Sequence, residues 1–194
     1  MYVAIEGIDT AGKSTQIAAL TEHFPNAVIT KEPGGTELGK EIREIVLGAK
    51  AKSKKAEFLL FLADRAEHIK EVVQPNTGKM IISDRSAVSG VAYALIQGEI
   101  GKSDLVSLNN FATNCTYPEK VFLLRLTQEE LEFRLSQKEL DGIELRGSEY
   151  LLNIQNAIIE AAELLKIELI EIDATQDRET ITQQILNNMK DRND

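Results

Sequence analysis

The sequence predicts an α/β fold in which five parallel strands form one sheet with helices on both faces. Short apolar runs alternate along the chain with longer segments in which apolar residues recur every three or four positions. Several of the short runs are apolar almost throughout, as in a parallel sheet that is covered on both sides. No internal repeat and no linker rich in Pro, Gly or Ser divides the 194 residues. We therefore expect a single domain over residues 1–194.

The expected strands and helices follow one another in regular alternation. The strands are Tyr2–Glu6, Asn26–Thr30, Lys79–Ser83, Lys120–Leu126 and Ile167–Ile172. The helices are Ser14–Phe24, Thr36–Leu47, Ala56–Val73, Ser86–Gln97, Ser103–Cys115, Gln128–Leu140, Glu149–Leu165 and Gln176–Met189. Right-handed crossovers between parallel strands place ligands at the carboxyl ends of the strands. Functional residues are expected at that edge of the sheet.

The stretch EGIDTAGKST, Glu6–Thr15, lies between the first strand and the first helix. Gly7, Gly12, Lys13 and Ser14 follow the spacing GxxxxGK(S/T), in which backbone N–H groups wrap around phosphate oxygens. The following helix N-terminus adds unpaired N–H donors and a partial positive charge. The alternative is a glycine-rich turn with an exposed lysine. The motif in this setting predicts a three-layer P-loop NTPase fold whose triphosphate site comprises Gly7, Ile8, Asp9, Thr10, Ala11, Gly12, Lys13, Ser14 and Thr15.

Two oxygen donors near this loop are candidate ligands for Mg²⁺. The hydroxyl of Ser14 has the position that binds the metal in phosphate loops. Asp84 closes the third strand, where a carboxylate can hold Mg²⁺ through water. The alternative for Asp84 is an ordinary loop aspartate.

The composition narrows the class of partner. A formal net charge of -9 argues against general attraction to nucleic acid or to anionic membranes. No window approaches the roughly 18 apolar residues of a membrane span, and the stretch Met1–Gly7 lacks the features of a signal peptide. Cys115 is the only cysteine, which excludes an intrachain disulfide and fits a reducing compartment. We expect small-molecule partners and a cytoplasmic location.

A phosphotransferase needs a second pocket for the acceptor of the phosphate, with cations that neutralise two closely approaching phosphate groups. The base-reading element NKxD of guanine-nucleotide switches does not occur in the sequence, which weakens a switch function. Arg43, Arg65 and Arg85 are the candidate cations, although any single arginine is more often a surface residue. Phe61 and Arg65 are four residues apart on one predicted helix face, which suits a flat base. The alternative is a core Phe61 beside a solvated Arg65.

With these residues assembled, the chain resembles the thymidylate kinases, which phosphorylate dTMP with ATP, and it is most similar to their bacterial branch. The resemblance covers nearly the full length. The phosphate loop indicates only a superfamily, whereas EPGGT and DRxxxSxxAY are far more specific. The matching segments are EGIDTAGKSTQ, KEPGGTELGKEIR, EFLLFLADRAEH, DRSAVSGVAY and IDATQ. The resemblance implies conversion of dTMP to dTDP with ATP and Mg²⁺, and a homodimer.

The resemblance also implies roles for the acceptor residues. Asp9 would bind the 3′-hydroxyl of dTMP, Phe61 would stack on thymine, and Arg65 would hydrogen-bond its edge. Arg43 and Arg85 would grip the phosphate of dTMP. The other implied acceptor residues are Glu32, Pro33, Ser89, Gly90 and Tyr93.

The implied mechanism is in-line attack by a dTMP phosphate oxygen on the γ-phosphorus of ATP. Tyr93 would crowd the ribose where a 2′-hydroxyl projects, although its spacing equally suits a core tyrosine. On the donor side, Arg134, Asp173 and Ala174 would bind ATP. The implied catalytic residues are Asp9, Lys13, Arg85 and Arg146.

The sequence departs from its relatives in the lid, residues 134–149. Some relatives carry an arginine within the phosphate loop where this chain has Thr10, so the lid must contribute a cation. Gly142 stands where many relatives have a lid arginine. The candidates left are Arg134, Lys138 and Arg146, and Arg134 is equally plausible as a solvated helix residue. We hypothesise that Arg146 reaches the transferring phosphate.

Two alternative functions stay open. A deoxynucleoside or other nucleoside monophosphate kinase on the same fold would share the phosphate loop and the aspartate–arginine pair, since these do not fix the acceptor. A non-catalytic nucleotide-binding switch would share the loop alone. For the homodimer, the predicted helices Ala56–Val73 and Ser86–Gln97 are the candidate interface.

Overall fold

The structure is a computed structural model that describes residues 1–48, 50–139 and 144–190. One sheet of five parallel strands lies at its centre, in the order β2-β3-β1-β4-β5. The strands are β1 (Tyr2–Glu6), β2 (Val28–Lys31), β3 (Ile81–Asp84), β4 (Lys120–Arg125) and β5 (Glu168–Asp173). The predicted five-stranded parallel sheet is confirmed.

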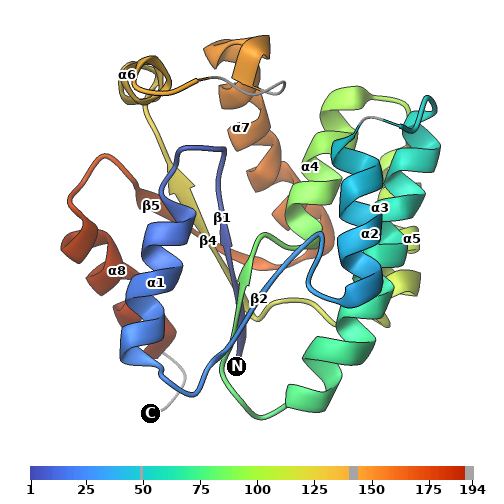
Figure 1. Ribbon diagram of the computed structural model, residues 1–194, viewed down its shortest axis with the longest axis horizontal. Helices are drawn as coiled ribbons and strands as arrows, with labels where there is room; N and C mark the ends of the chain where they lie inside the picture. Colours follow the sequence, from blue (N-terminus) through green and yellow to red (C-terminus); the bar gives the residue numbers. More distant parts are fainter. Residues whose placement is uncertain (49, 140–143, 191–194) are drawn as a thin grey trace.

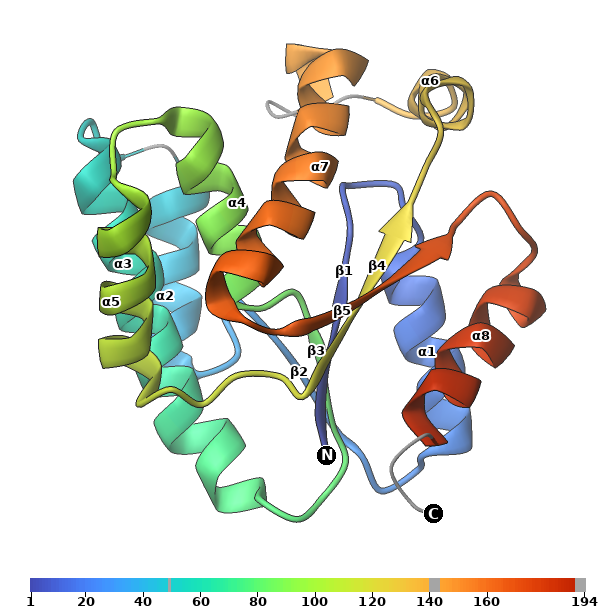
Figure 2. The ribbon, with the colours of Figure 1, turned by 180° about the vertical axis from the view of Figure 1, so that it is seen from behind.

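Helices cover both faces of this sheet. Figure 1 shows α1 and α8 on one side and α2 to α5 with α7 on the other, and Figure 2 shows the same layers from behind. Val3, Ala4 and Ile5 of the central strand β1 have no solvent exposure, as a doubly covered strand requires. The helices are α1 (Lys13–His23), α2 (Glu37–Leu47), α3 (Lys54–His68), α4 (Ala87–Gln97), α5 (Lys102–Thr113), α6 (Gln128–Ser136), α7 (Ser148–Leu165) and α8 (Arg178–Lys190).

The helix predicted over Ala56–Val73 differs most from the structure. It begins earlier, at Lys54, because the side chain of Ser53 accepts a hydrogen bond from the N–H of Ala56 and caps the first turn. After His68 the chain continues as a π-helix over Ile69–Val73 and then as a 3₁₀ turn over Gln74–Asn76. The proline within that turn lacks the N–H that an α-helix needs, which ends regular helix at this point.

Other boundaries shift by a few residues. Thr36 and Ser86, predicted as first helical residues, are instead N-caps whose side chains accept from the N–H of Gly39 and of Val88. The helix predicted over Gln128–Leu140 ends at Ser136, and its predicted last residue lies outside the described residues.

The carboxyl ends of the strands meet at one edge of the sheet. Asp84 of β3 pairs in register with Ile5 of β1 and with Lys31 of β2. Because the chain crosses from β3 to β4 over the central β1, the end of β1 lies where the strand order reverses, the usual ligand position in such sheets. None of the helices in the described parts of the chain is long and apolar enough to cross a membrane.

Candidate functional site

The loop between β1 and α1 has the backbone that its glycines permit. Gly12 has φ 94°, and Gly7 has φ 150° with Leu124 O only 3.0 Å from where a Cβ would stand. Lys13 folds back over this loop, where its Nζ donates to Gly7 O and to Ile8 O at 3.1 Å each. Burial lowers the pKa of Lys13 to about 8, and the charge of Arg85 acts in the same direction.

A cavity of about 460 Å³ lies beside this loop, and we call it the loop cavity. It collects loop residues together with cations from β2, α2, the end of β3 and the segment after α6. Gly7, Ile8 and Ala11, also predicted for the triphosphate site, do not line this cavity, and Ile8 and Ala11 belong to the hydrophobic core. The lining residues are Asp9, Thr10, Gly12, Lys13, Ser14, Thr15, Lys31, Glu32, Arg43, Asp84, Arg85 and Lys138.

A second cavity of about 330 Å³ opens between α2, α3 and α4, and we call it the Phe61 cavity. All ten residues predicted for the acceptor line it, so motifs far apart in the sequence converge on one space. Asp9, Glu32, Arg43 and Arg85 line both cavities, which places the junction of the two at these side chains. The lining residues are Asp9, Glu32, Pro33, Arg43, Val46, Leu47, Glu57, Phe61, Asp64, Arg65, Arg85, Ser86, Ser89, Gly90 and Tyr93.

Arg85 and Asp9 form an ion pair at the junction. Arg85 Nη2 donates to Asp9 Oδ1 at 2.7 Å, and Nη1 donates to Gly7 O at 3.1 Å. Arg85 has φ 70°, a strained value for a residue with a side chain, and this conformation of the strand end accompanies its reach toward the loop. Burial alone would raise the pKa of Asp9, but Arg85 and Lys13 outweigh it and hold that pKa below the ordinary value.

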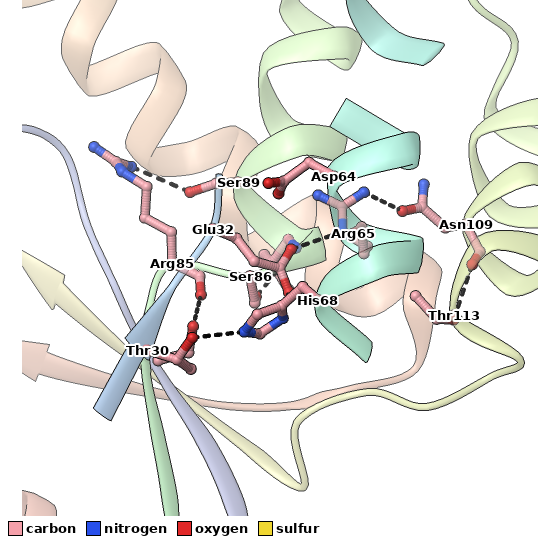
Figure 3. A network of polar contacts seen from close by, with 12 residues as sticks. Thr30, Glu32, Asp64, Arg65, His68, Arg85, Ser86, Ser89, Asn109 and Thr113 are labelled. Atoms are coloured by element: carbon pink, nitrogen blue, oxygen red, sulfur yellow. Dashed lines mark hydrogen bonds and ion pairs between the residues drawn. The ribbon is translucent and has the colours of Figure 1, made fainter. Parts of the chain in front are cut away.

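Arg65 is one of the most buried charged residues in the described structure, with 3% of its surface exposed. Its Nε donates to Glu32 Oε2 at 2.8 Å, and its Nη1 donates to Asn109 Oδ1 at 2.7 Å (Figure 3). The alternative of a solvated arginine beside a core phenylalanine is therefore wrong. Arg65 and Phe61 both face the same cavity.

Glu32 is the centre of a buried network that the sequence did not reveal. His68 Nδ1 lies 3.0 Å from Glu32 Oε1, and His68 Nε2 lies 2.7 Å from Thr30 Oγ1 (Figure 3). Burial would raise the pKa of Glu32, but Arg65 and His68 outweigh it and lower that pKa. His68 stands three residues after Arg65 on α3, and this i, i+3 spacing is the signal that could have linked them.

Glu6 is a functional candidate that was not predicted from the sequence. Its fully buried carboxylate accepts hydrogen bonds at 2.8 Å from the N–H and the hydroxyl of Ser86, and it also accepts from the hydroxyl of Ser89. Ser89 Oγ in turn accepts from Arg85 Nη1 at 3.1 Å. Burial raises the pKa of Glu6. The signal was a carboxylate at the end of an otherwise apolar strand.

The lid cations differ in position. Lys138 lines the loop cavity, where its Nζ also donates to Glu144 Oε1 at 2.8 Å. Arg146 lines neither cavity. Its Nη1 donates to Tyr150 OH at 2.7 Å, and its guanidinium carbon lies 3.7 Å from the centre of the Tyr150 ring. Gly142, predicted to occupy the position of a lid arginine, lies outside the described residues.

Arg134 joins the phosphate loop to the loop after β5. Its Nη1 donates to Thr10 O at 3.0 Å, and its Nη2 donates to Ala174 O at 2.7 Å. Arg134 is therefore not merely a solvated helix residue. The N–H of Thr175 donates to Asp173 Oδ1 at 3.0 Å, which shapes the loop that holds the predicted residues Asp173 and Ala174.

The predicted metal ligands line the same cavity. Ser14 and Asp84 both line the loop cavity. Asp84 Oδ1 is buried and has no hydrogen-bond partner within the described ranges, so it is an oxygen that a cation or its water would satisfy.

Comparison with known proteins gives a consistent family. The family model described as "Thymidylate kinase" matches residues 5–185. The chain is 73% identical over 189 residues to the thymidylate kinase of Sulfurimonas denitrificans, covering 97% of this chain and 99% of that relative. It is 57% identical over 185 residues to the thymidylate kinase of Aliarcobacter butzleri, covering 95% and 96% of the two chains.

A solved structure supports the same architecture. The crystal structure of thymidylate kinase from Ehrlichia chaffeensis superposes with a TM-score of 0.73 and covers 98% of both chains. Its sequence identity to this chain is 24%, so this likeness concerns the fold alone.

Proposed function

The chain belongs to the thymidylate kinase family and phosphorylates dTMP to dTDP with ATP as the donor, and from this premise we propose which residues do the work. The observation that carries the proposal is the meeting of the two cavities at Asp9, Arg43 and Arg85. One cavity has the phosphate loop and the other has an apolar wall with a buried arginine. This arrangement suits two nucleotides that meet phosphate to phosphate.

ATP would occupy the loop cavity. The loop N–H groups would bind its β and γ phosphates, and Lys13 would transfer its hydrogen bonds from the loop carbonyls to the outer phosphate oxygens. With a pKa of about 8, Lys13 carries its charge at neutral pH. The adenine would lie near Ala174, which Arg134 ties to the loop.

Mg²⁺ would enter with ATP at Ser14 and Asp84. Mg²⁺ is commonly bound by one or two carboxylates together with substrate phosphates. The orphaned oxygen of Asp84 and the exposed hydroxyl of Ser14 fit this mode, and the described parts of the chain hold no cluster of three or more His, Cys, Asp or Glu that would bind a resident metal. When bound, the ion would neutralise charge on the β and γ phosphates.

dTMP would occupy the Phe61 cavity. Its thymine would stack on Phe61 and receive a hydrogen bond from Arg65. Its phosphate would lie between Arg43 and Arg85 at the junction, where Arg43 Nη1 is already held by Pro33 O at 2.9 Å. Asp9 would accept from the 3′-hydroxyl.

Ser89, Gly90 and Tyr93 would form the wall along α4, with Tyr93 beside the ribose. Glu32 and Pro33 would shape the opposite side. A dTMP phosphate oxygen would then attack the γ-phosphorus as the bond to ADP breaks. The acceptor phosphate needs little help from a base, so positioning and charge neutralisation supply most of the rate. Each arginine contact that strengthens in the transition state would contribute about 3 kcal/mol.

A lid cation would complete the charge neutralisation. In the proposed role, Arg146 must leave Tyr150 to reach the transferring phosphate. Lys138 is the competing candidate, since it already lines the loop cavity. Both assignments need a cation to exchange partners when ATP binds.

We further propose a single domain and a cytoplasmic homodimer. Leu59 of α3, Ile96 of α4 and Phe111 of α5 leave large apolar side chains in solvent, and Phe111 is 85% exposed. A dimer through these helices would cover them. Light scattering of the native chain and of Phe111→Lys tests this, because the substitution should shift the mass toward that of one chain.

A substrate panel tests the proposed acceptor site. ADP release would be measured with dTMP, dUMP, UMP, CMP, AMP and thymidine. We expect the highest kcat/KM with dTMP, and preference for another acceptor would overturn the assignments in the Phe61 cavity. Nucleotide binding without acceptor-dependent turnover would favour a switch instead.

A further inference from the structure

Helix α5 sends one buried polar side chain to Arg65, although none of its residues lines the loop cavity or the Phe61 cavity. This residue is Asn109, which has no solvent exposure and whose Oδ1 accepts from Arg65 Nη1 at 2.7 Å. The contact joins residues 44 apart in the chain. A buried amide that ends on a buried guanidinium has a large cost if it is left unpaired.

The orientation of the Asn109 amide is fixed by its own helix. Its Nδ2 donates to Leu105 O at 2.7 Å, one turn earlier in α5. Because the amide nitrogen is used there, the oxygen must face Arg65. Figure 3 shows Asn109 pointing to the guanidinium from the side opposite Glu32.

These two contacts leave one edge of the guanidinium toward the cavity. Nε is paired with Glu32 and Nη1 with Asn109. Nη2 lies beside Gly90, where an added Cβ would come within 2.8 Å of it. Since the guanidinium is planar, two partners on different nitrogens fix both its plane and its rotation.

We propose that Asn109 is a positioning residue for base recognition, which holds Arg65 so that Nη2 is presented to the edge of the acceptor base while Gly90 leaves room for it. The inference rests on the proposed role of Arg65. A donor held at one point favours a base with a carbonyl oxygen there. Thymine presents O4 at that edge, whereas cytosine presents an amino group. Asn109 therefore contributes to the preference for dTMP over dCMP.

Asn109→Ala and Asn109→Asp form a matched pair. Both lose the hydrogen bond to Leu105, but only Asp keeps an oxygen for Arg65. We expect Asn109→Ala to raise the KM for dTMP about tenfold and to reduce the preference for dTMP over dCMP by a similar factor, with the KM for ATP unchanged. Asn109→Asp should restore most of both. Equal values for the two variants would overturn the inference.

Thr113→Val is the control on the same helix. Its hydroxyl donates to Asn109 O at 2.8 Å without touching Arg65, so this variant should lose stability and keep its base preference. If Asn109→Ala fails to fold, Gly90→Ala decides. An added methyl would come within 2.8 Å of Nη2 and would displace it, so the dTMP preference should fall with the KM for ATP unchanged. An unchanged preference would refute the presentation of Nη2 to the base.

Arg65→Lys separates this inference from the proposed function. A lysine retains the charge for Glu32 but has no planar fork. If Arg65→Lys keeps the full preference for dTMP over dCMP, Arg65 does not read the base and the proposed acceptor site fails. If Arg65→Lys loses the preference and Asn109→Ala keeps it, only the role of Asn109 fails.

Discussion

Arg65 in the Phe61 cavity and Arg146 in the lid are held in opposite ways. Arg65 is buried and paired with Glu32 after β2 and with Asn109 on α5, both more than 30 residues away. Arg146 is exposed and paired with Tyr150, four residues further along the same segment. The lid residue Lys138 likewise pairs locally, with Glu144.

These two modes of pairing indicate that the acceptor side of the site is preorganised. Long-range contacts in the interior fix the acceptor arginine before any nucleotide binds, and such preorganisation lowers the entropy that binding must overcome. Local contacts on the surface are weak, so a lid cation can exchange its partner for a phosphate at little cost. Substitutions on the acceptor side should therefore destabilise the fold, whereas substitutions in the lid should mainly lower turnover.

Removing Arg65 should have the largest effect on folding. Arg65→Leu leaves Glu32 buried without its main counter-charge, and breaking such a pair costs about 3–5 kcal/mol. Urea unfolding measures the loss. Arg146→Leu is the matched control on the exposed side and should change stability by less than about 0.5 kcal/mol. Equal losses in the two variants would remove the distinction between the two regions.

Of the two regions compared, the lid should have the larger effect on turnover. Arg146→Ala is expected to lower kcat by about 10²-fold, the effect of losing one charged donor to the transition state. Tyr150→Phe removes the hydroxyl that holds Arg146 and should leave kcat unchanged or higher. Single-turnover measurements with saturating dTMP give the values. If only Lys138→Ala lowers kcat, Lys138 and not Arg146 is the lid cation that contacts the transferring phosphate.

The charge of Lys13 should make the kcat/KM for ATP depend on pH. Because its pKa is lowered to about 8, the free enzyme loses this charge as pH rises, and neutral Lys13 attracts phosphate poorly. The kcat/KM for ATP should fall roughly fivefold between pH 8 and pH 9. In Lys13→Gln the remaining activity should not show this fall. Stability should change in the opposite direction and rise with pH. The cost of burying the charged Lys13 is fully present below pH 8 and disappears as pH rises toward the ordinary pKa of 10.5.

The smallest expected effect is a pH-dependent change in stability on substitution of Asp64, which lies on the acceptor side of the site. Its Oδ1 accepts from Gly34 N at 2.9 Å, and burial raises its pKa to about 6. The ionised form therefore costs stability above pH 6, and this cost vanishes below the ordinary pKa of 3.8, where folded and unfolded chains are both protonated. Asp64→Asn carries no such cost. Urea midpoints at pH 4.5 and 7.5 should move in favour of the variant at the higher pH, and a difference independent of pH would contradict this reasoning.

Local motifs predicted most of the site. The spacing of Gly7, Gly12 and Lys13 fixes the loop, because its geometry depends on neighbours in the chain. Four acceptor residues, Arg43, Phe61, Arg65 and Arg85, were candidates from their own chemistry and spacing, and the family resemblance supplied the others. All ten line the Phe61 cavity. Which strands and helices form also followed from apolar periodicity, whereas their ends depend on caps such as Ser53 and on the π-helix after His68.

The partners of the site residues could not be predicted in the same way. Asn109 reaches Arg65 only because α5 packs on α3, and nothing in the spacing of the sequence indicates that contact. Glu6 meets Ser86 and Ser89 across 80 residues or more. Such contacts depend on tertiary packing, and for that reason supporting residues such as Asn109 and Glu6 were missed. Val46, Leu47, Glu57, Asp64 and Ser86, which also line the Phe61 cavity, were not predicted either.

A structure of the chain with dTMP and a non-hydrolysable ATP analogue, set beside that of the ligand-free chain, tests these ideas most directly. We predict that Arg65 keeps Glu32 and Asn109 in both states, with the base edge on Nη2, while Arg146 or Lys138 leaves its local partner for the γ-phosphate. Thymine bound away from Phe61 and Arg65 would contradict the proposed acceptor site. An Arg65 that changes partners while Arg146 and Lys138 keep theirs would contradict a preorganised acceptor side and a mobile lid cation.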